Sequence, residues 1–283
     1  YIKNVLELLE DKNTVPFIAR YRKEMTGGMN EEEIKQIADE FNYMESLMKR
    51  KEEVIRLIDE QGMLTEELRN NINKQTVLNR VEDLYRPFKQ KKKTKATEAK
   101  RKGLEPLSKS IYAQNEKDIE DLAREYLNEE VETVKEAIQG ALDIIAENIS
   151  DNPKFRSYIL KVIKDTSSIT STKKKKAEDD TKIFEIYYDY EEPVKNIVPH
   201  RVLAINRGEK LKVLTVKLQH DLERLKNYIS KQVIKEGSQT AEYIETAIDD
   251  GLKRLIIPSI DREVRNDLTE YSEKHAVDIF EEN

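Results

Sequence analysis

The sequence predicts a mainly α-helical protein: an irregular multi-helix array with a helix-turn-helix-like module, a minor β element and a long C-terminal helix. Apolar residues recur at helical spacing in almost every segment outside residues 182–218. The 283 residues include eight glycines, seven prolines and no tryptophan, a composition that disfavours a turn-rich β protein. Charged residues make up 37% of the chain, which suits long exposed helix faces. We therefore expect more than half of the residues in helices, with strand mainly in residues 182–218.

The N-terminal segment predicts two short helices. Residues 1–10 place four apolar side chains on one helical face: Ile2, Val5, Leu6 and Leu9. Thr14 is a suitable N-cap for the second helix, and Pro16 fits its first turn. Gly27-Gly28 then ends that helix, because glycine adopts the left-handed conformation of a C-terminal cap.

A long helix is predicted from Asn30 to about Gln61, and its length makes it partly solvent-bridging. Glu33 completes a capping-box pattern with Asn30. The apolar face of this helix is formed by Ile34, Ile37, Ala38, Phe41, Met44, Leu47, Met48, Val54, Ile55 and Ile58. We expect both of its methionines, and Met63 beyond it, at core positions. Thr65 is the N-cap of the short helix that follows.

The next stretch has the outline of a compact helix-turn-helix-like module. A helix with an apolar face ends at Pro87, because proline lacks an N–H and clashes with the preceding turn. Thr94 or Thr97 can cap a second helix, and Gly103 can end it. Pro106 fits the first turn of a third helix.

This module is strongly basic within an acidic chain. Residues 86–102 carry nine positive charges against the single acid Glu98, a local charge of +8 in a chain of net charge -6. The candidate nucleic-acid-binding residues are Arg86, Lys89, Lys91, Lys92, Lys93, Lys95, Lys100, Arg101 and Lys102. Lysine neutralises phosphates without reading bases, so such binding would depend on salt and carry little sequence specificity. The alternative is a solvated charged loop. In either case we expect Lys91, Lys92 and Lys93 to lie outside the packed helices.

Residues 108–165 again show helical periodicity. Asp151, Asn152 and Pro153 form a helix start. Residues 167–176 read as a polar loop that ends in the lysines Lys173 to Lys176. Because acids follow at once, at Glu178, Asp179 and Asp180, we favour a solvated loop over a second phosphate site.

The remaining third of the chain contains the least certain elements. Residues 182–190 are aromatic-rich and fit either a strand or a helix. Residues 200–208 favour a helix ended by Gly208 and followed by a strand over residues 211–218, with a hairpin across residues 207–209 as the alternative. Residues 221–234 and 240–257 return to helix. Pro258 then kinks or restarts a helix that continues to the end of the chain.

Residues that could carry out chemistry are sparse. Cysteine is absent and the three histidines, His200, His220 and His275, lie far apart in sequence, so we expect neither a metal site nor a catalytic set. No phosphate-binding glycine loop is present, and no cofactor is expected. No stretch approaches the roughly 18 apolar residues of a membrane span. We therefore expect a binding protein that is not an enzyme.

Four segments closely resemble signatures of the bacterial Tex family of transcription accessory proteins. They occur in the family's order across nearly the whole chain: TVPFIARYRKEMTGG (residues 14–28), VEDLYRPFKQKKKTKATEAKRKGLEPL (81–107), PHRVLAINRGEK (199–210) and IPSIDREVRNDLTEYSEKHA (257–276). The family usually has a serine between the proline and histidine of the third segment. Here Pro199 directly precedes His200, so that helix lacks the expected capping side chain.

The resemblance implies a cytoplasmic protein that binds nucleic acid, RNA or DNA, and acts in transcription, with RNA polymerase as a possible partner. It implies a Tex-type N-terminal helical region with the basic module at residues 1–110 and a central helical region at 111–283. The chain stops where the family's RNase H-like domain would begin, before its helix-hairpin-helix and OB-fold domains. We therefore expect a fragment whose last helix carries apolar surface that this chain leaves uncovered, at Leu268, Ala276, Val277, Ile279 and Phe280.

Overall fold

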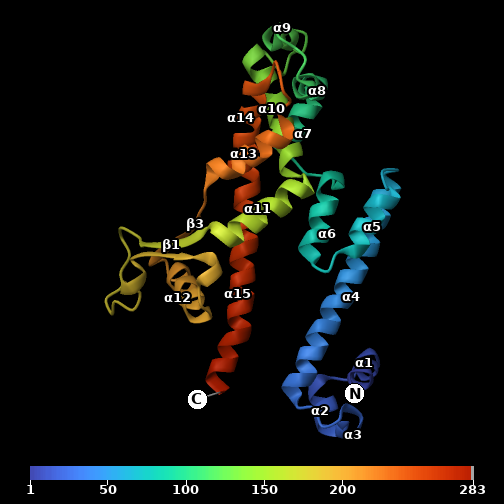
Figure 1. Ribbon diagram of the computed structural model, residues 1–283, viewed down its shortest axis with the longest axis vertical. Coiled ribbons are helices and arrows are strands. Elements are labelled where there is room, and N and C mark those ends of the chain that lie inside the picture. The colour runs from blue at the N-terminus through green and yellow to red at the C-terminus, as the bar shows by residue number, and fades with distance from the viewer. Residues whose placement is uncertain (282–283) are drawn as a thin grey trace. The chain divides into compact units, whose positions relative to one another are not determined.

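The fold of the protein is described by a computed structural model that covers the backbone of residues 1–281 and the side chains of residues 1–276 (Figure 1). Helices make up 68% of the chain, so the predicted mainly α-helical class is confirmed. The chain forms two compact units, Tyr1–Lys89 and Gln90–Asn283, and each is described by itself. The division of the sequence at residue 110 stays a prediction.

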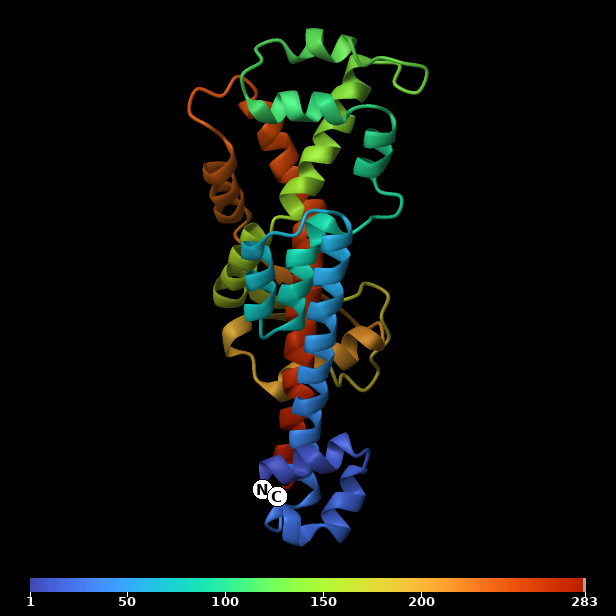
Figure 2. The same ribbon diagram turned by 90° about the vertical axis from the view of Figure 1, so that its right-hand side faces the viewer.

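The first unit begins with three short helices packed on the start of a long one, as Figures 1 and 2 show. They are α1 (Ile2–Glu10), α2 (Val15–Tyr21), α3 (Lys23–Thr26) and the long α4 (Glu31–Glu60). Their small core is formed by Val5, Leu8, Ile18, Ala19 and Ile34. Gly27 has a φ of +69° and ends α3. The single helix expected from Pro16 to Gly27 is divided at Arg22 into α2 and α3. The Asn30 side chain accepts from the backbone N of Glu33 at 2.8 Å, which confirms the capping box.

The far end of α4 packs against a second small core. It is covered by α5 (Glu66–Lys74), α6 (Leu78–Tyr85) and the 3₁₀ turn η1 (Arg86–Phe88). The expectation that Met44, Met48 and Met63 are core residues is wrong, because these side chains are 51%, 58% and 56% exposed. The helix joins two separate clusters, and at its middle only one face is buried, at Leu47.

The second unit is built around α10 (Val134–Ser150), most of whose inward face is fully buried. Its neighbours are α7 (Lys95–Arg101), α8 (Glu105–Ala113), α9 (Ile119–Arg124) and α14 (Ala241–Asp250). The close crossing of α10 requires glycine at position 251, since a Cβ there would lie 2.9 Å from the backbone oxygen of Ala146.

Helices α11 (Pro153–Thr166), α13 (Leu222–Val233) and α15 (Ile257–Glu281) complete this unit. Helix α11 starts at Pro153 as predicted, and Asn152 caps it. Helix α14 continues into α15 through a π-helical turn, η4 (Gly251–Ile256), directly before Pro258. A proline ring clashes with the preceding turn of an α-helix, and the wider π-turn gives it room. The kink or restart that was predicted at Pro258 is therefore a π-helical turn. Leu268 and Ala276 are partly buried, and the side chains of Val277, Ile279 and Phe280 lie outside the described residues.

A small antiparallel sheet with the order β2-β1-β3 lies beside α15 with helix α12 (Figure 1). The elements are β1 (Ser168–Lys173), η2 (Glu185–Tyr187), β2 (Asp189–Pro193), η3 (Val194–Asn196), α12 (Pro199–Lys210) and β3 (Leu214–Gln219). Its core is formed by Ile169, Phe184, Tyr187, Ile205, Val213, Leu214 and Val216.

Three expectations for this region need correction. The predicted polar loop at residues 167–176 is wrong over β1, whose Ser171 is buried and donates to the backbone oxygen of Tyr187. The helix after Pro199 is confirmed and the alternative hairpin is wrong. Gly208 does not end that helix, which continues to Lys210. Glycine at this position leaves room for Leu214, whose Cδ1 lies 2.5 Å from where a Cβ would be. No side chain caps α12, in agreement with the absence of the family's serine.

Candidate nucleic-acid interface

The basic segment Arg86–Lys102 begins at the end of the first unit. Pro87 lies in η1, where α6 has ended, as predicted. The half-buried guanidinium of Arg86 lies 3.9 Å from the carboxylate of Asp83, so its charge is directed toward the protein. Lys89 is exposed.

Within the second unit, Lys91 does not lie outside the packed helices, contrary to expectation. Its ammonium forms a hydrogen-bonded ion pair with Asp151 and lies 3.7 Å from Oε1 of Glu147. All three side chains are largely buried. Lys91 therefore attaches the basic segment to the C-terminal end of α10, and its charge is compensated there.

Arg101 is likewise held by acids of the protein. Its guanidinium donates to Glu130, with 2.9 Å between Nη1 and Oε1, and a weaker contact reaches Glu98. The hydrogen bond from Arg101 is the main reason that the pKa of the Glu130 carboxyl lies below its usual value. Lys102 adds a smaller attraction to the same carboxyl.

The remaining lysines of the second unit face solvent to different degrees. Lys92, Lys93, Lys95 and Lys100 are exposed and Lys102 is half-buried, and none has an ion pair within 4 Å among residues 1–276. Lys95 lies close enough to Asp143 and Asp250 to favour their charged forms, although burial raises the pKa of Asp143 overall. Lys92, Lys93 and Lys100 are thus the residues best placed to meet an external anion.

Local sequence explains why these lysines, which lie before α7 and in its last turn, face away from the core. The hydroxyl of Thr94 accepts from the backbone N of Thr97 at 3.1 Å and starts α7. Helix α7 buries Ala96 and Ala99 against α10, which turns its lysines outward. Gly103, at φ +85°, allows the tight turn into α8. The predicted helices are present, and their binding to the phosphates of RNA or DNA stays a prediction.

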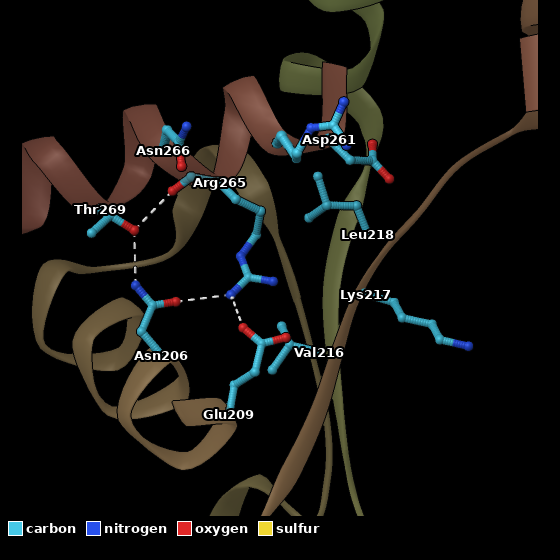
Figure 3. Close-up of a pocket in the computed structure, with 10 residues that line it drawn as sticks. Asn206, Glu209, Val216, Lys217, Leu218, Asp261, Arg265, Asn266 and Thr269 are labelled. Atoms are coloured by element: carbon cyan, nitrogen blue, oxygen red, sulfur yellow. Dashed lines mark hydrogen bonds and ion pairs between the residues drawn. The ribbon is translucent and has the colours of Figure 1, made fainter. Parts of the chain in front are cut away.

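Two features escaped sequence reasoning, and both involve segments that resemble family signatures. An open cavity of about 540 Å³ lies between α12, β3 and α15 (Figure 3). Arg265 donates from Nη2 to Oδ1 of Asn206 at 2.9 Å and to Oε2 of Glu209 at 2.7 Å. Asn206 in turn donates to Oγ1 of Thr269 at 2.8 Å. This network joins α12 to α15, and the spacing of its residues along the chain gave no signal of it.

The second feature is a row of three neighbouring polar side chains, Ser167, His220 and Asp261, of which the first two are hydrogen-bonded. Oγ of Ser167 lies 2.7 Å from Nδ1 of His220, and Nε2 of His220 lies 2.8 Å from Oδ1 of Asp261. The combination resembles a hydrolytic triad in composition, but Ser167 is 3% exposed and closed to a substrate. We assign it a structural role, because it links the end of α11, the end of β3 and the start of α15.

Two absences concern the described part of the chain. No helix there combines the length and the apolar character of a membrane span. Within the same residues, no three His, Cys, Asp or Glu side chains lie close enough together to hold a metal ion.

Comparison with known proteins gives a consistent result over the whole chain. Residues 1–59 match the Tex-like protein N-terminal domain, and residues 114–280 match the Tex central region-like family. The chain is 49% identical to the uncharacterized protein YdcI of Bacillus subtilis, over 100% of this chain and 40% of that protein. It is 32% identical to the transcriptional accessory protein Tex of Neisseria gonorrhoeae, over 100% and 38%. It is 28% identical to the human S1 RNA-binding domain-containing protein 1, over 99% and 30%. The chain therefore spans about 40% or less of the length of these relatives.

Proposed function

The chain belongs to the Tex family, and on this premise we propose that it is the helical scaffold of a cytoplasmic transcription accessory protein that contacts nucleic acid. The contact is electrostatic and is made to the phosphates of RNA or DNA by the basic segment Arg86–Lys102. The role is one of binding rather than catalysis. The names of relatives support it, since one is a transcriptional accessory protein and another an S1 RNA-binding domain protein.

The observation that carries the proposal is the exposure of Lys92, Lys93 and Lys100 without an acid partner among the described residues. Their neighbours Lys91 and Arg101 are already compensated by carboxylates, so the free charge is concentrated on fewer residues than the sequence suggests. Each lysine that neutralises a phosphate releases condensed counterions, and the gain is the same for every base sequence.

The test is a titration of the 283-residue chain with a short DNA duplex and a single-stranded RNA at several salt concentrations. Changing Lys92, Lys93 and Lys100 together to Gln should lower the slope of log affinity against log salt by up to about 2.7 on duplex DNA, at about 0.9 per contact. Binding to all sequences should weaken alike. Fluorescence anisotropy measures both effects.

The matched control changes three exposed lysines on other parts of the second unit, Lys117, Lys135 and Lys161, to Gln. It has the same net charge and should leave the slope nearly unchanged. An unchanged slope in the Lys92/Lys93/Lys100 variant would contradict the proposed contact. An equal decrease of the slope in the control variant would contradict it too.

A second candidate, a protein-interaction scaffold that docks RNA polymerase or another partner, is favoured by one observation. Met44 and Met48 lie one turn apart on α4 and are more than half exposed, beside the partly exposed Tyr43. If this face docks purified RNA polymerase, changing both methionines to Lys should reduce the co-purified polymerase. Nucleic-acid affinity should stay the same. Equal polymerase recovery from both proteins would rule this face out.

A further inference from the structure

The tip of the small sheet carries a second group of lysines, which come from two segments about 35 residues apart in sequence. Lys174, Lys175 and Lys176 follow β1 and are exposed. The backbone N of Ala177 donates to the oxygen of Lys174 at 3.0 Å, so Lys175 and Lys176 occupy the middle of a turn. This geometry places their side chains in solvent.

Strand pairing brings further lysines to the same tip. The backbone N of Lys174 donates to the oxygen of Val213 at 2.9 Å, which continues the pairing of β1 with β3 beyond Lys173. Lys212, in the turn between α12 and β3, therefore lies beside the β1 turn. Lys210, at the end of α12, is also exposed. We call Lys174, Lys175, Lys176, Lys210 and Lys212 the lysine tip.

The acids that follow in sequence do not neutralise these lysines by pairing. Asp179 accepts hydrogen bonds from Tyr188 Oη at 2.7 Å and from the backbone N of Phe184 at 3.1 Å. Its carboxylate therefore stabilises the loop. Glu209 receives the guanidinium of Arg265. None of the five lysines of the tip has an ion pair within 4 Å among residues 1–276. Neutralisation by the acids at residues 178–180 is the reason that the sequence favours a solvated loop here.

We propose that the lysine tip is a second contact surface for the phosphate backbone of a double-stranded nucleic acid. Its side chains are compact point charges on flexible stems, which suit phosphates and carry no base information. The ring of Tyr188, which pairs with the start of the tip at Lys173, is half-buried and has the ammonium of Lys173 4.6 Å from its centroid. This ring is therefore not an open stacking platform for unpaired bases, whereas a duplex offers one charge per about 1.7 Å of its axis.

This surface is made of other residues than the Arg86–Lys102 segment, so the two can fail separately. In the 283-residue chain, changing Lys174, Lys175 and Lys176 to Gln should lower the salt slope on a short DNA duplex by up to about 2.7. Changing Lys210 and Lys212 to Gln should lower it by up to about 1.8. Binding to a single-stranded oligonucleotide of the same length should change less. The Lys117/Lys135/Lys161 variant serves as the charge-matched control for the triple variant, and a Lys117/Lys135 variant serves for the double variant.

Unchanged duplex slopes in both variants, at unchanged thermal stability, would overturn the inference while leaving the Lys92/Lys93/Lys100 result intact. An equal loss in the control variant would overturn it too, since the effect would then follow net charge alone. Exposed Ile183 and Ile186 lie in the same loop, so co-sedimentation with phosphatidylserine vesicles is measured in parallel. Vesicle binding that depends on the tip, without a duplex effect, would replace the inference with a membrane contact.

Discussion

At the scale of single residues, Lys91 shows how a charge in a basic run becomes part of the fold. Its ammonium meets the largely buried carboxylates of Asp151 and Glu147. Changing Lys91 to Met should destabilise the protein by about 1–3 kcal/mol, because the acceptors lose their charged donor. Urea unfolding followed by circular dichroism measures this.

Lys92 provides the matched control for that measurement, since it is exposed and adjacent in sequence. Changing Lys92 to Met should alter the free energy of unfolding by less than about 0.5 kcal/mol. Equal effects of the two changes would contradict the structural role of Lys91.

The hydrogen bond from Tyr188 to Asp179 predicts a dependence of stability on pH at both extremes. It is the main cause that lowers the pKa of Asp179 below 3.8, and it raises the pKa of Tyr188 to about 12. The carboxylate's contribution is present above its unfolded pKa and is lost as pH falls through the lower folded value. The phenol's contribution is present below about 10 and is lost as pH rises toward 12.

Changing Tyr188 to Phe should therefore flatten both limbs of a plot of melting temperature against pH. It should also remove one late-ionising phenol from an alkaline absorbance titration. A variant that keeps the acid limb of the native protein would show that Asp179 is held by its backbone donors instead.

At the scale of elements, the crossing of α10 and the π-helical turn depends on Gly251. In an exposed helix, a change of glycine to alanine stabilises by about 1 kcal/mol. At position 251 the new Cβ would lie 2.9 Å from the backbone oxygen of Ala146, so the two helices must separate. Gly251→Ala should therefore destabilise by about 1–3 kcal/mol.

Thermal unfolding shows whether Gly251→Ala raises or lowers the melting temperature. A lower melting temperature means that the contact with Ala146 outweighs the gain in helix propensity. Asn227→Ala, on the exposed side of α13, gains helix propensity without a new contact and should be neutral or slightly stabilising. A stabilising Gly251→Ala change would mean that the crossing is looser than the structure shows.

At the scale of the whole molecule, an acidic chain of net charge -6 presents its basic residues in local groups. Many of its charges are used internally, as in the pairs of Arg50 with Glu82 and Arg254 with Asp250. A polyanion is therefore attracted to particular surfaces and repelled by the rest. This makes the two proposed contacts sensitive to ionic strength, since exposed charges are screened over about 10 Å at 0.1 M salt.

The sequence alone determined the helical class and most helix starts. Asn30 and Thr65 cap the helices that they were expected to cap, and Thr94 and Asn152 cap helices whose starts were expected there, because a capping side chain reaches a backbone N–H only two or three residues away. Thr14 precedes α2 as expected, but its side chain makes no capping hydrogen bond. A helix cap therefore depends only on residues that are close together in the sequence, so the sequence is enough to predict it.

The tertiary structure alone decided which side chains meet. Lys91 and Asp151 are 60 residues apart, and Ser167 and His220 are 53 apart. Strand β1 reads as a polar loop because its Ser and Thr residues gain burial and hydrogen bonds only after β2 and β3 have paired with it. Met44 and Met48 follow a core pattern, yet they are more than half exposed while Leu47 between them is buried in the core of this unit. The spacing of apolar residues shows which face of a helix is apolar. It does not show which distant segment of the chain packs on that face, and only the tertiary structure decides this.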